Sequence, residues 1–130
     1  MKIEVSSGEI FDKLSIVNIK LRHATNPEDR AVIKLERDAL ASAVLLISVQ
    51  IEDSEVAAEV DRQYDNLMLV NEQLWSIEDR LRERERDSKF DAEFIELARS
   101  VYITNDLRAR IKRTLNQLTK SNFFEVKIYA

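Results

Sequence analysis

The chain of 130 residues contains one glycine, Gly8, and one proline, Pro27. Average usage would give about nine glycines and six or seven prolines in a chain of this length. Sandwiches, barrels and parallel α/β sheets need these residues at their many corners. The scarcity of both therefore predicts a few long helices. It also excludes phosphate-binding glycine loops and nucleophile elbows, and with them several classes of enzyme.

The remaining composition narrows the possible functions further. There is no cysteine and only one histidine, His23, which excludes disulfides, thiolate zinc sites and histidine-rich metal sites. The formal net charge of −4 disfavours binding to nucleic acid. The most apolar run, residues 39–51, is shorter than the roughly 20 residues that span a bilayer, and the first residues lack the apolar stretch of a signal peptide. We expect a cytoplasmic protein with one domain over residues 1–130, no cofactor, no nucleic-acid partner and no membrane span.

Helix start signals divide the chain into four segments. Ser6 followed by Glu9 forms a capping box, Asn26 precedes a proline at a first helical position, and Asp53 with Ser54 marks a third start. The predicted helices reach from this first cap to about residue 24, from 27 to about 49, from 54 to about 86, and from about 91 to 120.

Two of these helices suggest self-association. The third holds about 32 residues and would be roughly 48 Å long, whereas a compact domain of this size is about 30 Å across. The second is apolar on all sides around residues 44–49, as in helices that lie at the centre of a bundle or against a partner. These features predict a homodimer through the second helix and the overhanging third helix.

The two ends of the chain alternate polar and apolar residues, over residues 2–5 and 123–129. Lys2 and Glu4 are complementary in charge to Glu125 and Lys127, as two paired strands would require. The predicted fold is therefore mainly α: an elongated bundle of about four helices, with a long antiparallel hairpin and a short two-stranded ribbon of the termini.

The third and fourth helices should form that hairpin, because their connection near Ser88 is short. Facing residues then have numbers that sum to about 177, which places Trp75 opposite Tyr102. The apolar stripe of the fourth helix also shifts by roughly 100° midway, so that polar residues replace it on one face. The candidate binding residues gathered by this geometry are Asn71, Glu72, Trp75, Glu78, Tyr102, Asn105, Asp106, Arg108 and Lys112.

Two interpretations of this cluster are open. In the first, Trp75 and Tyr102 are core aromatics, and Asn71 and Asn105 form a buried pair that sets the register. In the second, polar groups beside two aromatic rings form a ligand pocket. Arg108 and Lys112 would then hold the phosphate of a phosphorylated sugar or a nucleotide.

Acidic pairs at i, i+3 spacing, such as Glu93 with Glu96, offer a third possibility. All-helical nucleotide pyrophosphohydrolases hold magnesium with acids at this spacing, but in a chain with 24 acidic residues such pairs also arise by chance. Arg99 and Arg108 are expected to form salt bridges with these acids. Asp12 and Lys13 are expected to be an exposed pair. No residue is predicted to be catalytic and no metal ligand is assigned.

Several sequence motifs resemble a bacterial family of small helical proteins classed as a domain of unknown function. The similar segments are Val-Asn-Glu-Gln-Leu-Trp-Ser-Ile-Glu-Asp at residues 70–79, Glu-Leu-Ala-Arg-Ser-Val-Tyr at 96–102, Thr-Asn-Asp at 104–106, and the opening residues 1–16. Residues 40–65 match nothing in the family, and Asn18 stands where an acid is expected. The resemblance implies long helices and assigns no catalytic residue. The leading prediction is thus a non-catalytic helical binding or assembly module, and the alternative is a small-molecule or metal-dependent hydrolytic site on the hairpin.

Overall fold

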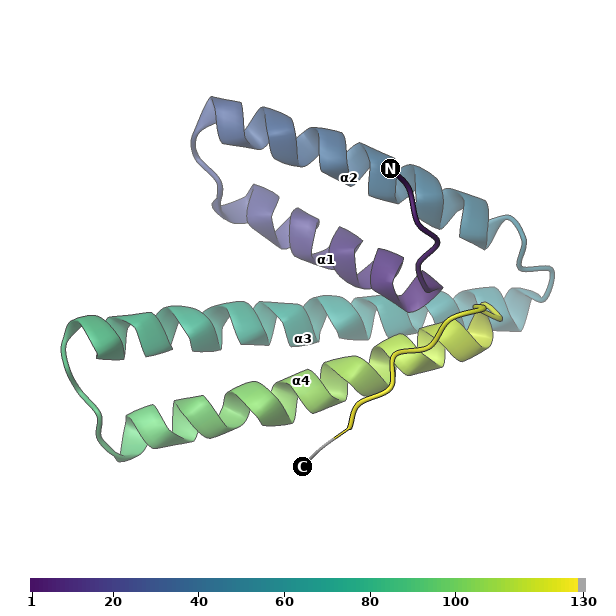
Figure 1. The fold of residues 1–130 in the computed structure, drawn as a ribbon. Helices are drawn as coiled ribbons and strands as arrows, with labels where there is room; N and C mark the ends of the chain where they lie inside the picture. Colours follow the sequence, from purple (N-terminus) through teal and green to yellow (C-terminus); the bar gives the residue numbers. More distant parts are fainter. Residues whose placement is uncertain (129–130) are drawn as a thin grey trace.

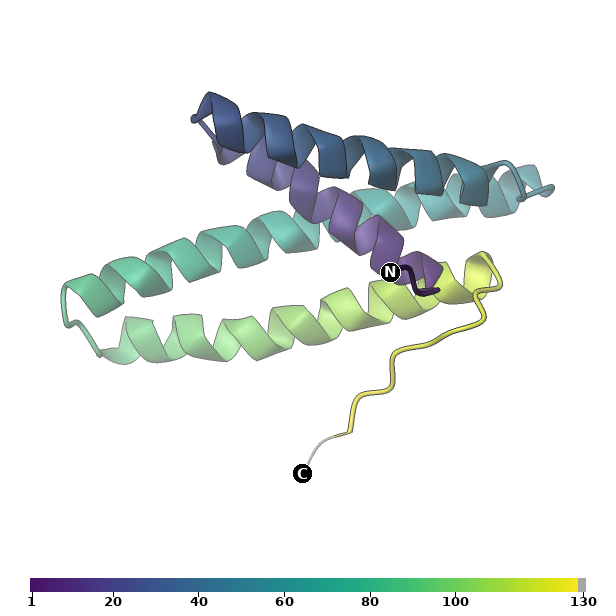
Figure 2. The same cartoon turned by 45° about the horizontal axis from the view of Figure 1, so that its top comes forward.

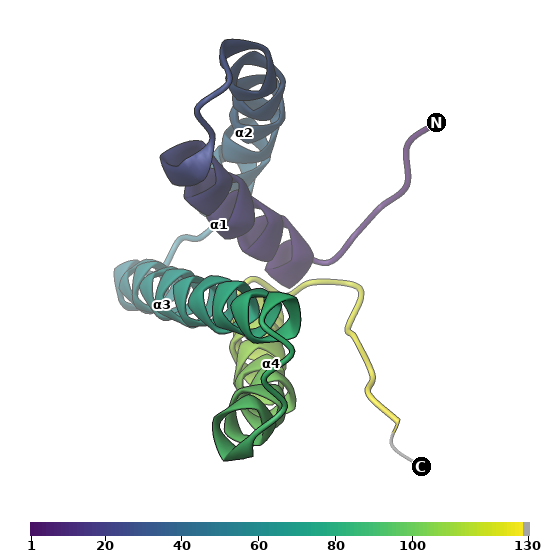
Figure 3. The same ribbon diagram turned by 90° about the vertical axis from the view of Figure 1, so that its left-hand side faces the viewer.

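The computed structural model describes residues 1–128 and consists of two helical hairpins (Figure 1). The first contains α1 (Ser7–His23) and α2 (Pro27–Ser48), and the second contains α3 (Ser54–Arg86) and α4 (Ala92–Leu118). α1 packs on both α3 and α4, and α2 lies on the far side of α1 (Figures 1 and 3). The predicted bundle of four helices is confirmed. Its long hairpin extends well beyond α1 (Figure 2).

Each helix begins at a polar cap, as the sequence predicts. The Ser6 hydroxyl accepts a hydrogen bond from the Glu9 N–H, and Asn26 accepts bonds from the first turn of α2. Asp53 and Asp91 do the same for α3 and α4. These bonds satisfy backbone donors that have no partner within a helix, which explains why the boundaries fall within two residues of those predicted.

The hydrophobic core lies between α1, α3 and α4. Its buried side chains are Phe11, Val60, Leu67, Val70, Leu74, Ile111 and Leu115. None of its fully buried members comes from α2, and residues such as Val44 and Ile47 only pack against its edge. A central place for α2 in the bundle is therefore wrong, while its burial against a partner stays a prediction.

The predicted ribbon of the termini is not formed. No strand occurs in residues 1–128, and the two end segments diverge from the start of α1 (Figure 3). Of the charges expected to pair across the ribbon, Glu125 and Lys127 contact α4 instead: Glu125 binds Lys112, and Lys127 lies 3.9 Å from Asp106. Glu4 accepts a hydrogen bond from Asn122 at 3.2 Å. An isolated pair of short strands is only marginally stable in water, so the C-terminal segment forms contacts with α4 instead of pairing as a strand. Tyr129, the last residue of the predicted strand, lies outside the described residues.

Candidate functional site

A buried ion pair joins α1 to α4. Asp12 is only 2% exposed, and its carboxylate accepts two hydrogen bonds from Arg108, at 2.9 Å from Nε and 2.6 Å from Nη2. This is the bidentate geometry that makes arginine–carboxylate pairs strong. The expectation that Asp12 is exposed is therefore wrong, whereas Lys13 does face solvent.

α3 contributes the third side of the same cluster. Asn71 donates from Nδ2 to Asp12 Oδ1 at 3.0 Å and to Ser15 Oγ at 2.6 Å. The Ser15 hydroxyl donates to the Asp12 backbone carbonyl at 2.7 Å. We call Asp12, Ser15, Asn71 and Arg108 the polar junction, since together they fix the relative positions of three helices.

The charges of the polar junction are balanced within the protein. The hydrogen bonds from Arg108 to Asp12 raise the pKa of the guanidinium above its ordinary value, although burial alone would lower it. Arg108 also donates from Nη1 to Asn105 at 3.3 Å. Among the described residues, no side-chain nitrogen or oxygen that is itself shut off from solvent lacks a partner. Arg108 is thus an internal counter-ion that neutralises the Asp12 carboxylate.

Close to the junction, the start of α1 touches the backbone of α4. A Cβ atom at Gly8 would lie 2.5 Å from the Lys112 carbonyl oxygen and 2.9 Å from Asn116 Oδ1. The Gly8 N–H donates to that Asn116 oxygen at 2.7 Å. Gly8, the only glycine in the chain, is therefore needed where α1 lies directly against the backbone of α4.

Lys112 is held between two carboxylates. Its ammonium group forms ion pairs with Glu9 of α1 and with Glu125 of the C-terminal segment, the latter at 3.1 Å. Burial by itself would lower the pKa of Lys112, but the hydrogen bonds to these two acids outweigh it and raise the pKa. Like Arg108, Lys112 is already neutralised by the chain itself.

The two aromatic residues of the predicted cluster have separate surroundings. Trp75 stacks on His23 of α1, with 4.6 Å between ring centroids and 16° between ring planes. Tyr102 is 57% exposed and makes no ring contact with any described residue. The hairpin register itself agrees with the prediction at its tip, where Arg84 pairs with Glu93 and the two numbers sum to 177. The two rings nonetheless do not pack as a pair, because Trp75 turns toward α1.

The polar candidates are also distributed over different contacts. Asn71 binds α1 and not Asn105, so the predicted asparagine pair is wrong. Glu72 pairs with Arg22 of α1, and Glu78 lies 3.8 Å from Arg82 on its own helix. The hairpin therefore does not gather the candidate residues into one pocket.

The carboxylates of the hairpin pair with arginines. Glu93 binds Arg80 and Arg84, and Glu96 lies 3.4 Å from Arg99. Nowhere in residues 1–128 are three histidine, aspartate or glutamate side chains grouped so that they could hold a metal ion. The acidic spacing that suggests a magnesium site is used for ion pairs in this fold.

The functional residues missed by the sequence analysis lie on one stripe of α1. Gly8, Asp12, Ser15 and Ile19 follow each other at spacings of four, three and four, and all are buried. A glycine, an aspartate and a serine at core spacing signal a close, polar helix contact. Hydrophobic periodicity does not mark these positions as buried, because three of the four side chains are not apolar.

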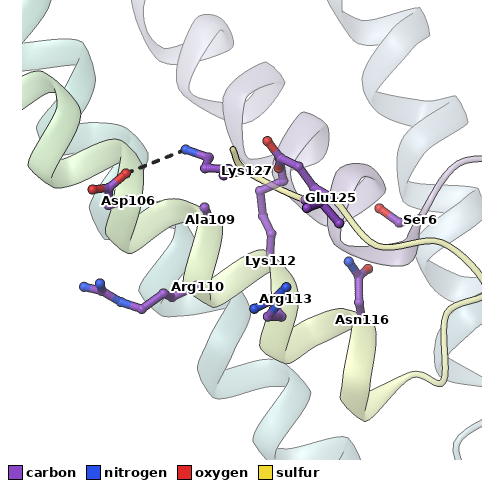
Figure 4. Close-up of a pocket in the computed structure, with 10 residues that line it drawn as sticks. Ser6, Asp106, Ala109, Arg110, Lys112, Arg113, Asn116, Glu125 and Lys127 are labelled. Atoms are coloured by element: carbon purple, nitrogen blue, oxygen red, sulfur yellow. Dashed lines mark hydrogen bonds and ion pairs between the residues drawn. The ribbon is translucent and has the colours of Figure 1, made fainter. Parts of the chain in front are cut away.

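One hollow of the molecule lies beside this contact. A cavity of about 360 Å³ is enclosed by α4, by Ser6 before α1, and by residues 125–127 of the C-terminal segment (Figure 4). Of the predicted binding residues, Asp106 and Lys112 line it.

In comparisons with known proteins, no family model, no curated protein and no solved structure matches the chain. The family resemblance therefore stays a prediction from the motifs. Within the described residues, no helix has the length and apolar character needed to cross a membrane.

Proposed function

We propose that the chain is a non-catalytic helical assembly module that forms a symmetric homodimer through the outer face of α2. One observation supports this above all: apolar side chains line that face over most of the helix. Four of them, Val32, Leu35, Leu46 and Val49, are each between 65% and 74% exposed, and Leu45 beside them is 64% exposed. Isolated exposed apolar residues are ordinary, but a contiguous row of this size marks an interaction surface.

The spacing of the row is that of a helix-pairing seam. Its positions are 32, 35, 39, 42, 46 and 49, which alternate steps of three and four residues. The face that α2 turns toward the protein carries Ile33, Leu40, Val44 and Ile47, all half-buried, and lies about 150° away at 100° per residue. α2 thus has a second apolar face that its own chain leaves uncovered.

The order of large and small side chains along the seam is the same in both directions. It reads Val32, Leu35, Ala39, Ser42, Leu46, Val49, with large residues outside and small residues in the middle. An antiparallel pair of α2 helices centred between residues 40 and 41 places Leu35 against Leu46 of the partner subunit. A two-fold dimer requires this kind of self-complementary surface, which favours a second copy as the occupant.

Charge and area agree with this pairing. In the antiparallel register, Glu36 would face Leu45 of the partner subunit and Asp38 would face Ala43 of the partner subunit, so neither acid in the middle of α2 opposes another acid. The apolar row represents on the order of 500 Å² per copy. With its polar rim the pair reaches about 1,200 Å² in total, the lower end of the range for stable interfaces.

The experiment is sedimentation and light scattering on the full chain at several concentrations. The wild type should be a dimer, and Leu35→Glu and Leu46→Lys should each be folded monomers, since both positions are exposed in one chain. Mixing the two variants should restore a heterodimer, because antiparallel pairing brings the new glutamate against the new lysine. Parallel pairing would leave both charges against leucine and give no rescue.

A matched control is Leu69→Glu on α3, which introduces the same charge at a position that is 59% exposed. It should leave the dimer intact. A wild type that stays monomeric at millimolar concentration, or a Leu69→Glu variant that dissociates while Leu35→Glu does not, would contradict the proposal.

A further inference from the structure

We propose that the cavity between α4 and the C-terminal segment binds a small ligand carrying a phosphate group. This site is independent of the α2 surface and of the predicted hairpin pocket. It rests on the hydrogen-bond donors and the charges that the fold places around one hollow.

Two nearly buried side chains present unused donors to this cavity. Asn116 is 2% exposed, and its Oδ1 accepts from the Gly8 N–H. The Ser6 hydroxyl oxygen accepts from the Glu9 N–H in the same way. Since both acceptor atoms are occupied by the start of α1, the Asn116 amide N–H groups and the Ser6 O–H are left. Neither donates to any described residue, and both residues line the cavity.

Basic side chains outnumber acidic ones along this cavity, and Arg110 extends toward its Asp106 end, away from Asn116 and Ser6 (Figure 4). Four basic side chains line the cavity, Arg110, Lys112, Arg113 and Lys127, against two acidic ones, Asp106 and Glu125. This local excess contrasts with the net charge of −4 for the whole chain. Arg110 and Arg113, one helical turn apart on α4, form no ion pair with any described residue and therefore can bind an anion without breaking an internal bond.

Glu125 shows where the anion would sit. Its carboxylate reaches from the C-terminal segment to Lys112 at 3.1 Å (Figure 4). A carboxylate and a phosphate oxygen accept the same hydrogen bonds, so Glu125 occupies part of the anion position as an internal competitor. The volume of about 360 Å³ lies at the small end of ligand pockets, which fits a phosphomonoester of a small polar molecule.

The test is an NMR titration of the isotope-labelled full chain with inorganic phosphate, ribose 5-phosphate and ribose, at constant ionic strength. The chain has one glycine, so the Gly8 amide is a unique reporter beside Asn116. We expect saturable shifts of the Gly8 and Asn116 amide signals with both phosphates and none with ribose.

Three variants locate the site. Arg110→Ala/Arg113→Ala should weaken phosphate binding at least tenfold, and Glu125→Gln should strengthen it several-fold by removing the competitor. Arg82→Ala/Arg86→Ala removes the same charge from exposed positions of α3 and should leave the affinity unchanged. The proposal is overturned by an absence of saturable shifts, or by equal losses in the two double-arginine variants, which would indicate general charge attraction only.

Discussion

Replacing Arg108 with methionine tests the polar junction most directly. The substitution leaves the Asp12 carboxylate 2% exposed, with Asn71 as its remaining side-chain donor. Removing one partner of a buried ion pair costs about 3–5 kcal/mol, because the other charge is then uncompensated. The Arg108 side chain is itself 27% exposed and part of the site can admit water, so we expect the lower figure, about 3 kcal/mol. For 130 residues this corresponds to a fall in Tm of about 10 °C.

The double variant Asp12→Asn/Arg108→Met separates a lost ion pair from lost packing. It removes the buried charge while keeping an oxygen for Asn71 to bind. We expect it to be more stable than Arg108→Met alone by about 1–2 kcal/mol, since neighbouring groups in one network are not additive.

The assay is urea unfolding followed by circular dichroism, at one protein concentration because dimer formation would shift apparent stability. Arg99→Met is the matched control: its partner Glu96 and Arg99 itself are exposed, and such pairs contribute less than about 1 kcal/mol. If Arg108→Met is no more costly than Arg99→Met, or if the double variant is less stable than Arg108→Met, the reasoning about the junction is refuted.

Three further outcomes follow from the same contacts. Gly8→Ala should lower the free energy of unfolding by about 1–2 kcal/mol in the urea assay, because the overlap with the Lys112 carbonyl outweighs a gain of about 1 kcal/mol in helix propensity; a stabilised variant would contradict the close approach. Burial raises the pKa of Tyr64 above 10.0, and the acidic partners of Lys112 raise its pKa above 10.5 despite burial. Both groups therefore bind protons more tightly in the folded protein, so the stability they contribute is complete below about pH 10 and is lost as the pH rises above it. Thermal melts at increasing pH should show this loss, and Tyr64→Phe should reduce it. Emission from Trp75, the single tryptophan, should change in His23→Ala, because this variant removes the ring that stacks on the indole; an unchanged emission spectrum would contradict the stacking.

The helices were predictable because their signals are local. Ser6, Asn26 and Asp53 cap a helix through bonds to residues two or three positions away, and no distant contact is needed to form them. The scarcity of glycine and proline likewise limits the number of turns along the whole chain, which favours long helices. Class and boundaries of the elements therefore follow from neighbours in the sequence.

The ribbon was mispredicted because alternation and charge complementarity do not identify the partner. Glu125 has the charge to pair with a lysine, but the chain offers Lys2 at the other terminus and Lys112 on α4. The helical lysine is held rigidly next to the C-terminal segment, whereas a strand partner would first have to be ordered. The choice depends on tertiary structure that alternation cannot report.

The polar junction was missed for a related reason. Periodicity indicates which face of α1 is apolar, and by that criterion Asp12 is a surface residue. It becomes a core residue only because Arg108, 96 positions away, brings an opposite charge to it. Arg108 and Asn71 were identified as unusual from sequence, but their shared partner lies on a helix outside the predicted hairpin.

Self-association and phosphate binding, as proposed, use opposite parts of the molecule. α2 lies beyond α1, whereas the cavity lies between α4 and the C-terminal segment, so antiparallel pairing along α2 leaves both cavities of a dimer open (Figures 3 and 4). α1 is the physical connection, because it packs on α2 and also supplies Gly8 and Glu9 to the contact with α4. The polar junction fixes α1 on α4 through several hydrogen bonds, which leaves α1 a single well-defined position. Phosphate affinity should therefore be the same in the wild type and in the monomeric Leu35→Glu variant. A difference between them, measured by the same NMR titration, would mean that α1 has two positions and couples the two surfaces.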